Sequence, residues 1–203
     1  MTTRIQKAVF CLFVPLLLLA CGSSPQVRWF SLSSMESAYQ PDGDEAVVLG
    51  LGPLRMPEYL NRSQMVTRGA GAELQVDEFN RWAEPFAVAV HRVIAEDVDK
   101  LVTGATVIAF PYDSRIRSHV DYRLIGDVTR FEADMSGRVV LELQWGISST
   151  DSEIVVKPGR RRYETQVSAT GDAAAVADAM NRALGKFARD IAASLEAVLA
   201  RKD

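Results

Sequence analysis

Two long stretches of the chain place apolar residues three and four positions apart, which is the spacing of an amphipathic helix. The first begins at Pro85, which suits a first helical turn because its missing N–H is not needed there, and ends near Gly104. The second runs from about Ala173 to Leu199. The predicted apolar stripes are Phe86, Val90, Ile94, Val98 and Leu101 in the first helix, and Val176, Met180, Leu184, Phe187, Ile191, Leu195 and Val198 in the second.

Most of the remaining chain shows strand patterns. Residues 46–51 form a continuous apolar run, which favours a strand buried on both faces. Residues 139–147 and 163–169 alternate between apolar and mostly polar side chains, as in a sheet with one covered face. We also expect strands at 27–32, 65–68, 73–76, 106–110 and 121–132, a polar loop at 33–45, and turns at 69–71, 135–137 and 157–159.

These elements predict one α+β domain over residues 27–203. We expect a mainly antiparallel sheet of about six to seven strands, with two long amphipathic helices packed on one face. A chain of this length is long enough to bury a substantial core in a single domain.

The N-terminus has the organisation of an export signal. Arg4 and Lys7 precede an apolar run over residues 8–20, which is shorter than the roughly 20 residues that a spanning helix needs. The run ends in Leu18-Leu19-Ala20-Cys21, which matches the lipobox of bacterial lipoproteins. We therefore predict a signal peptide at 1–20 and a mature chain that begins at Cys21, where N-acyl diacylglycerol is attached. The alternative is an ordinary cleaved signal with an incidental cysteine.

The residues after the predicted cleavage site bear on location. Gly22, rather than Asp, follows the cysteine, and in the usual enterobacterial sorting rule this favours the outer membrane, facing the periplasm. Residues 21–26 form a short lipidated tether before the folded domain.

Charge and cysteine content exclude several classes of protein. The chain has 23 Lys and Arg residues against 26 Asp and Glu residues, and this mild acidity argues against a nucleic-acid partner. The two cysteines are Cys11, inside the predicted signal, and Cys21. The mature chain is therefore expected to contain no disulfide and no thiol nucleophile.

The search for catalytic and metal-binding motifs is negative. The sequence contains no nucleophile elbow, no zinc-protease motif and no phosphate-binding loop. His91 and His119 lack partners at ligand spacing, and the carboxylates Asp77, Glu78 and Glu84 are explained as favourable charge before a helix. We expect no enzymatic activity, no metal and no cofactor beyond the lipid on Cys21.

Several short motifs, in order along the mature chain, resemble the ABC-type transport auxiliary lipoprotein family of the paraquat-inducible protein C type. The matching pieces are Phe30-Ser31-Leu32, Gly52-Pro53 with Arg55, Pro57-x-Tyr59-Leu60-x-Arg62, Met65-Val66-Thr67-Arg68, Arg81-Trp82-Ala83-Glu84-Pro85, and Tyr122-Arg123-Leu124 with Phe131. The resemblance implies a partnership with mammalian-cell-entry (MCE) domain proteins and ABC transporters of the Gram-negative envelope. It also implies a place at the outer-membrane end of a route for lipids or other hydrophobic molecules. Homo-oligomerisation is a further expectation, because MCE assemblies are rings.

The motif residues have both a functional and a structural interpretation. Pro53, Pro57 and Tyr59 either shape a partner-binding loop or fix a crossover between strands. Trp82 either fills the core beside the helix start or anchors an interface. The remaining candidates are Leu60, Pro85 and three arginines, Arg55, Arg62 and Arg68, which either contact an acidic partner or lipid headgroups or form surface ion pairs.

Two further groups of arginines have the same ambiguity. Arg160, Arg161 and Arg162 open a predicted strand, where they form either a solvated edge that discourages sheet-to-sheet association or a patch for a partner or headgroups. Arg115 and Arg117 flank the other side of the meander.

The leading hypothesis is a non-enzymatic lipoprotein subunit of an MCE-type transport system, which docks the periplasm-spanning MCE protein at the outer membrane. One alternative is an activator of a cell-wall synthase, although such proteins normally have a much longer tether than residues 22–26. The others are a periplasmic lipid-binding carrier and a periplasmic hydrolase.

Overall fold

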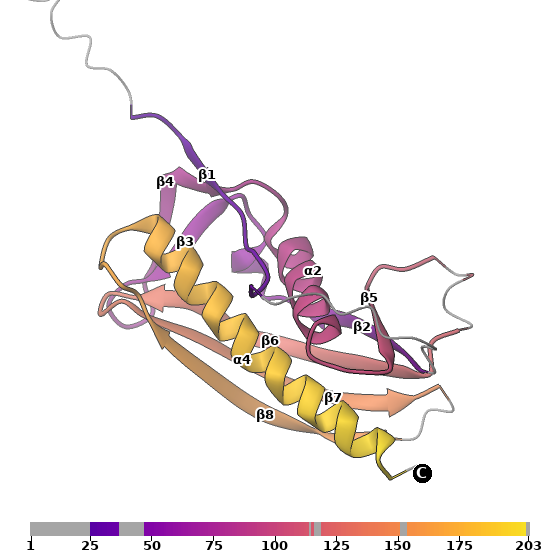
Figure 1. Cartoon of the computed structure of the whole chain (residues 1–203). Coiled ribbons are helices and arrows are strands. Elements are labelled where there is room, and N and C mark those ends of the chain that lie inside the picture. The colour runs from indigo at the N-terminus through magenta and orange to yellow at the C-terminus, as the bar shows by residue number, and fades with distance from the viewer. Residues whose placement is uncertain (1–24, 37–46, 114, 116–118, 151–153, 202–203) are drawn as a thin grey trace, which may run out of the picture.

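The computed structural model describes residues 25–36, 47–113, 115, 119–150 and 154–201. The predicted signal peptide, Cys21 and Gly22 lie outside these residues, as does most of the loop expected at 33–45. The helices are α2 (Phe86–Asp99), α4 (Ala173–Leu199) and the short 3-10 helix η1 (Glu58–Leu60). The strands are β1 (Arg28–Phe30), β2 (Val47–Arg55), β3 (Gln64–Arg68), β4 (Leu74–Trp82), β5 (Ala105–Ala109), β6 (Tyr122–Asp134), β7 (Arg138–Ser149) and β8 (Ile154–Gln166) (Figure 1).

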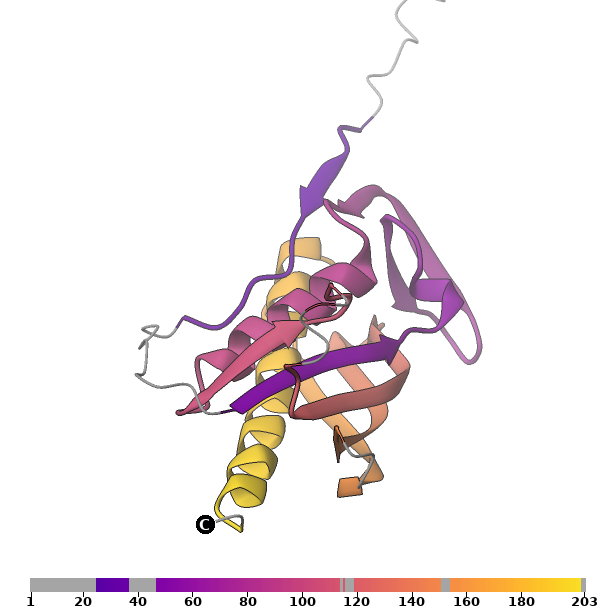
Figure 2. The same cartoon turned by 90° about the vertical axis from the view of Figure 1, so that its right-hand side faces the viewer.

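The long strand β6 organises the sheet. Along one edge it pairs antiparallel with β7, which in turn pairs antiparallel with β8. Its other edge is divided, because β2 runs parallel to its first half and β3 runs parallel to its last residues. β5 extends the β2 side in parallel, whereas β4 and then β1 extend the β3 side, the first antiparallel and the second parallel (Figure 2).

The two predicted helices are confirmed, and they pack side by side on one face of the sheet. α2 contacts β2 and β5, α4 contacts β7 and β8, and the helices also contact each other (Figure 1). Phe187 of α4 lies between Trp145 of β7 and Tyr163 of β8, with ring centroids 5.5 and 5.6 Å away. This cluster joins the helix layer to the sheet.

The α+β class is therefore confirmed, but the sheet has eight strands and is mixed. The antiparallel prediction holds for β6, β7 and β8 and for the β3–β4 hairpin, whose turn includes Gly71 at a φ of +62°. It fails around β2, which has a parallel neighbour on each side. Strands in parallel sheets are buried on both faces and have nearly continuous apolar sequences. The apolar run at 46–51 has this pattern.

The predicted turn at 157–159 is wrong, because Lys157, Pro158 and Gly159 lie inside β8. The pairing with β7 shifts register between Trp145 and Ile147, opposite Pro158. Proline lacks the N–H of a regular ladder and is tolerated at such irregularities and on edge strands. Among the described residues β8 pairs with β7 alone, so it is an edge strand. An edge strand tolerates proline, and the chain therefore continues through Pro158 without turning.

The segment that follows β1 is fixed across both helices. The Ser33 backbone N–H donates to Oδ1 of Asn181 on α4, at 3.1 Å. The Met35 backbone N–H donates to Oδ1 of Asp97 on α2, at 2.7 Å. Asp97 is fully buried, and this burial raises the pKa of its carboxyl group. Residues 32–35 thus form a clamped arm that joins β1 to the helix layer.

Candidate partner-binding site

The motif residues between β2 and β3 begin at a position that requires glycine. Gly52 has a φ of +112°, and a Cβ there would lie 2.7 Å from Cβ of Phe110. Pro53 and Arg55, which follow it, are exposed at the end of β2. Pro57 then precedes η1, which holds Tyr59 and Leu60. The segment is therefore an ordered crossover on which Pro53 and Arg55 are exposed.

A buried carboxylate holds this crossover in place. Glu132 of β6 is fully buried and accepts hydrogen bonds from the Tyr59 hydroxyl at 2.6 Å, from Nε of Arg68 at 2.7 Å and from Nε of Arg130 at 2.8 Å. Burial and the bond to Glu132 raise the pKa of Tyr59. The motif residues Tyr59 and Arg68 thereby tie η1 and β3 to β6. The sequence analysis did not single out Glu132. Its one distinguishing feature in the sequence is a carboxylate placed between the apolar residues Phe131 and Ala133.

The three candidate arginines of this segment have different surroundings. Arg55 forms an exposed ion pair with Asp127, and Arg68 binds Glu132. Arg62 is exposed, and its guanidinium has no hydrogen bond or ion pair among the described residues. Arg62 is therefore the member of the set whose charge is available to a ligand.

Trp82 and Pro85 mark the start of α2. The Trp82 side chain is 5% exposed and its ring lies 5.0 Å from that of Phe86, so Trp82 packs in the core beside the helix start. Pro85 directly precedes the helix, and its carbonyl accepts from Val88 and Ala89. Leu60 is also buried in the core.

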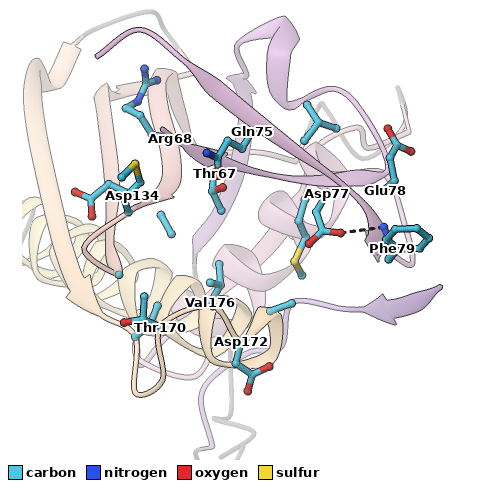
Figure 3. A pocket seen from close by; sticks show the side chains of 18 residues that line it. Thr67, Arg68, Gln75, Asp77, Glu78, Phe79, Asp134, Thr170, Asp172 and Val176 are labelled. Atoms are coloured by element: carbon cyan, nitrogen blue, oxygen red, sulfur yellow. Dashed lines mark hydrogen bonds between the residues drawn. The ribbon is translucent and has the colours of Figure 1, made fainter. Parts of the chain in front are cut away.

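A groove of about 760 Å³ lies between the β3–β4 hairpin, the β6–β7 turn and the first turns of α4 (Figure 3). Its lining includes the partly exposed apolar side chains of Val76, Phe79 and Met135, and Val176 of α4 faces it as well. Such exposed apolar side chains in a concave site are typical of interaction surfaces.

Acidic side chains surround this groove. Asp77, Glu78, Asp134 and Asp172 line it, and the one arginine in the lining is Arg68, which binds Glu132. Burial opposes the ionisation of Asp134, but hydrogen bonds from Ser136 and Arg138 outweigh it and lower the pKa of Asp134 to about 2. The lining of the groove is therefore apolar and acidic, and arginines outside the lining pair with Glu78, Asp134 and Asp172 at 3.4, 3.1 and 3.9 Å.

The structure corrects the interpretation of two of these carboxylates. Asp77 and Glu78 lie within β4, away from the start of α2, so they do not stabilise that helix. Asp77 accepts from the backbone N–H groups of Phe79 and Asn80. Glu84 does lie beside α2, where it pairs with Arg92 at 2.6 Å.

The histidines have no metal-site geometry. Nδ1 of buried His91 lies 2.6 Å from the Ala87 carbonyl oxygen and must donate to it, while Nε2 accepts from the Leu54 backbone N–H at 2.9 Å. Burial lowers the pKa of His91, which favours this neutral form. His119 is exposed, and the described residues contain no cluster of three or more potential metal-binding side chains.

The other candidate arginines that the structure describes do not line the groove. Arg160, Arg161 and Arg162 are exposed on β8, where Arg162 pairs with Glu164 at 2.6 Å. Arg115 pairs with Asp113, and Arg117 lies outside the described residues.

No helix in the described part of the chain is long and apolar enough to cross a membrane.

Comparison with solved structures supports the fold. An uncharacterized protein superposes with a TM-score of 0.69 at 16% identity, covering 85% of this chain and 99% of its own. A Xanthomonas campestris protein gives a TM-score of 0.64 at 20% identity, with 86% and 98% coverage. A hypothetical protein from Chlamydia trachomatis gives 0.50 at 8% identity, with 76% and 98% coverage. No curated protein matches the chain.

The sequence itself carries the stronger similarity. Residues 30–192 match the model of the ABC-type transport auxiliary lipoprotein component. The matched region extends from the end of β1 into the last turns of α4, so it includes the crossover, the Glu132 cluster and the groove. The chain belongs to the family of ABC-type transport auxiliary lipoprotein components.

Proposed function

We propose that this protein is a non-enzymatic lipoprotein subunit of an MCE-type lipid transport system, anchored through Cys21 on the periplasmic face of the outer membrane. The family match supports an auxiliary role in transport. The predicted lipobox and Gly22 support the anchor and its location. In this role the folded domain docks the periplasm-spanning MCE protein.

The observation that carries the docking role is the groove between the β3–β4 hairpin and α4. Its exposed apolar residues, Val76, Phe79 and Met135, offer area that a partner can bury. Its acidic rim selects for basic side chains and repels acidic surfaces. We therefore propose that a segment of the MCE protein with apolar and basic residues occupies this groove.

Site-specific photocrosslinking in intact envelopes tests this proposal. A photoreactive amino acid replaces Val76, which lies in the groove, or Ile154, which is exposed on β8 outside it. We expect an MCE-domain protein, identified by mass spectrometry, to crosslink at position 76 and not at position 154. The charge reversal Glu78→Lys should weaken the crosslink.

Two results contradict the proposal. Recovery of peptidoglycan synthases alone at position 76 would favour the cell-wall activator. Separation of the inner and outer membranes on a density gradient tests the location, with Cys21→Ser as the unlipidated control. Sedimentation of the wild-type protein with the inner membrane would contradict the outer-membrane assignment.

The volume of the groove favours one alternative function, a lipid carrier. About 760 Å³ lies within the range of small-molecule sites. A carrier should retain non-covalent phospholipid after detergent purification, and Val76→Trp, which fills the groove, should reduce this lipid. Absence of any lipid beyond the acyl chains on Cys21 would exclude the carrier and leave the docking role.

A further inference from the structure

An exposed aromatic residue lies close to the point where the chain enters the fold. Trp29 of β1 is 59% exposed and Val27, two residues earlier, is 41% exposed. Phe30, on the opposite face of the strand, packs against the core instead. β1 projects at one end of the molecule in both views (Figures 1 and 2). Neither Trp29 nor Val27 lines the docking groove.

Trp29 shares a surface hollow of about 350 Å³ with Arg62. Asn61, Ser63 and Glu84 also line this hollow, so it presents a guanidinium, an amide and a hydroxyl group beside an indole ring. The Glu84 carboxylate is paired with Arg92 at 2.6 Å. Arg62 has no hydrogen bond or ion pair through its guanidinium among the described residues, unlike Arg55 and Arg68. An arginine with free donors is suited to bind phosphate oxygens, and tryptophan is suited to the boundary between water and lipid.

Chain length brings this surface close to the predicted anchor. Trp29 lies only eight positions after Cys21, a reach of at most roughly 28 Å when fully extended. The start of α4 lies at the same end of the fold, since Arg28 and Asp172 are 3.9 Å apart. The far end of α4 is about 40 Å from its start, because each helical residue adds about 1.5 Å.

The clamped arm gives this end of the molecule a fixed direction. Ser33 and Met35 are bonded to α4 and α2, only a few residues after Trp29. β1 is also bonded to β4 in a register that pairs Trp29 with Arg81. The exposed face of β1 is therefore held in one orientation relative to the groove and the helices.

We propose that Val27, Trp29, Asn61 and Arg62 form a membrane-contact patch, which rests on the headgroup region of the bilayer that carries the lipid anchor. Trp29 lies at the level of the interface, and Arg62 binds the phosphates of anionic lipids. The inference rests on the proposed lipidation of Cys21. It adds a second, non-covalent contact that orients the domain relative to the bilayer.

Fluorescence quenching by brominated lipids tests the patch. The full-length lipidated protein is reconstituted into vesicles of phosphatidylcholine and phosphatidylglycerol whose acyl chains carry bromine near the headgroup. Trp145 is 4% exposed and does not line the hollow, so it serves as the unquenched internal reference. Trp82 is 5% exposed but lines the hollow, so any quenching that persists without Trp29 is assigned to it. We expect strong quenching in the wild-type protein and its reduction in Trp29→Phe to the level of the two buried tryptophans.

The arginine is tested in the same vesicles. Arg62→Gln should lower the ratio of membrane-contacting to free domains about five-fold, the effect of one basic side chain near an anionic surface. Arg201→Gln is the matched control, because Arg201 is exposed beyond the far end of α4. It should leave quenching unchanged.

Flotation of the vesicles separates the two proposals. Protein that floats with the vesicles but shows no quenching of Trp29 would overturn the patch while the anchor stands, and would assign Trp29 to a protein contact. Protein that does not float would overturn both. Equal effects of Arg62→Gln and Arg201→Gln would remove Arg62 from the patch.

Discussion

Glu132 and Asp127 are both carboxylates of β6 that bind arginine, yet their surroundings differ. Glu132 is fully buried and has two arginine partners, whereas the Asp127 side chain is 48% exposed and faces the exposed Arg55. Water screens the second pair strongly. A buried charge that loses its partner cannot be rehydrated, so the first cluster has the larger effect on folding.

The first prediction compares the two sites directly. Glu132→Gln should lower the free energy of unfolding by about 2–3 kcal/mol, less than a fully enclosed pair because Arg68 and Arg130 are partly exposed. Asp127→Asn should change it by at most about 1 kcal/mol. Urea denaturation measures both, and equal losses would contradict the assignment of Glu132 as the structural carboxylate.

The second prediction concerns pH and His91. Burial lowers the pKa of His91 in the folded state below its ordinary value of 6.5, so the unfolded chain binds a proton first as the pH falls. Its contribution to stability is complete above pH 6.5 and is lost as the pH falls through the lowered pKa. His91→Gln, which cannot titrate, should flatten the loss of stability below pH 6.5 in urea titrations. An unchanged slope would show that other groups cause it.

At the scale of residues, the sequence identified several residues of the candidate site but not the contacts that these residues make. Tyr59 and Arg68 were recognised from short motifs, but their shared partner Glu132 lies 73 and 64 residues away. Local spacing contains no information about such a contact. Trp29 was placed in a strand, but its exposure depends on the pairing of β1 with β4.

At the scale of elements, α4 begins with a side-chain cap. Oδ1 of Asp172 accepts from the Ala174 backbone N–H at 3.1 Å, which satisfies one of the free donors of the first turn. Asp178, on the exposed face of the same helix, makes no such bond. The first turn also lines the groove, so the cap affects both the helix and the site.

The third prediction follows from this cap. Asp172→Ala should lower the free energy of unfolding by about 1 kcal/mol, the usual cost of removing an N-terminal cap. Asp178→Ala should change it by less than about 0.5 kcal/mol. Thermal unfolding followed by circular dichroism compares the two variants, and a larger effect at position 178 would show that the cap has no energetic role.

Hydrophobic periodicity was sufficient to predict the helices and most strands, because the pattern of each element depends only on which of its own faces is buried. It was insufficient for the order of the strands. β2 pairs with residues of β5 that lie 58 positions further along the chain and with residues of β6 that lie 72 or 73 positions further, and no local pattern specifies those partners. Pro158 was mistaken for a turn because its tolerance depends on an irregular edge strand, which only the assembled sheet creates.

At the scale of the whole molecule, two aromatic clusters join the layers. Trp82, Phe86 and Phe131 connect the β4 end of the sheet to α2, and Phe187 connects α4 to β7 and β8. Both clusters are deeply buried and belong to one continuous core. Removing either should therefore weaken the fold as a whole.

The fourth prediction tests this cooperativity. Phe187→Ala should lower the free energy of unfolding by about 3–5 kcal/mol, because it leaves a cavity between α4 and the sheet. Val88→Ala, on the exposed side of α2, should cost less than about 0.5 kcal/mol. Far-ultraviolet and near-ultraviolet signals should report a single transition in each variant. Separate transitions for helix and aromatic signals would contradict a shared core.

The clamped arm also determines how the domain bears a mechanical load. A pull on the chain at Pro25 along the direction of β1 would strain its hydrogen bonds to β4 together, because those bonds link the strand to its neighbour sideways. The bonds of Ser33 to Asn181 and of Met35 to Asp97 come next in line and direct the tension into both helices. Under the anchoring and docking proposed above, tension would load the bonds between β1 and β4 first and would reach the helix layer through the clamped arm.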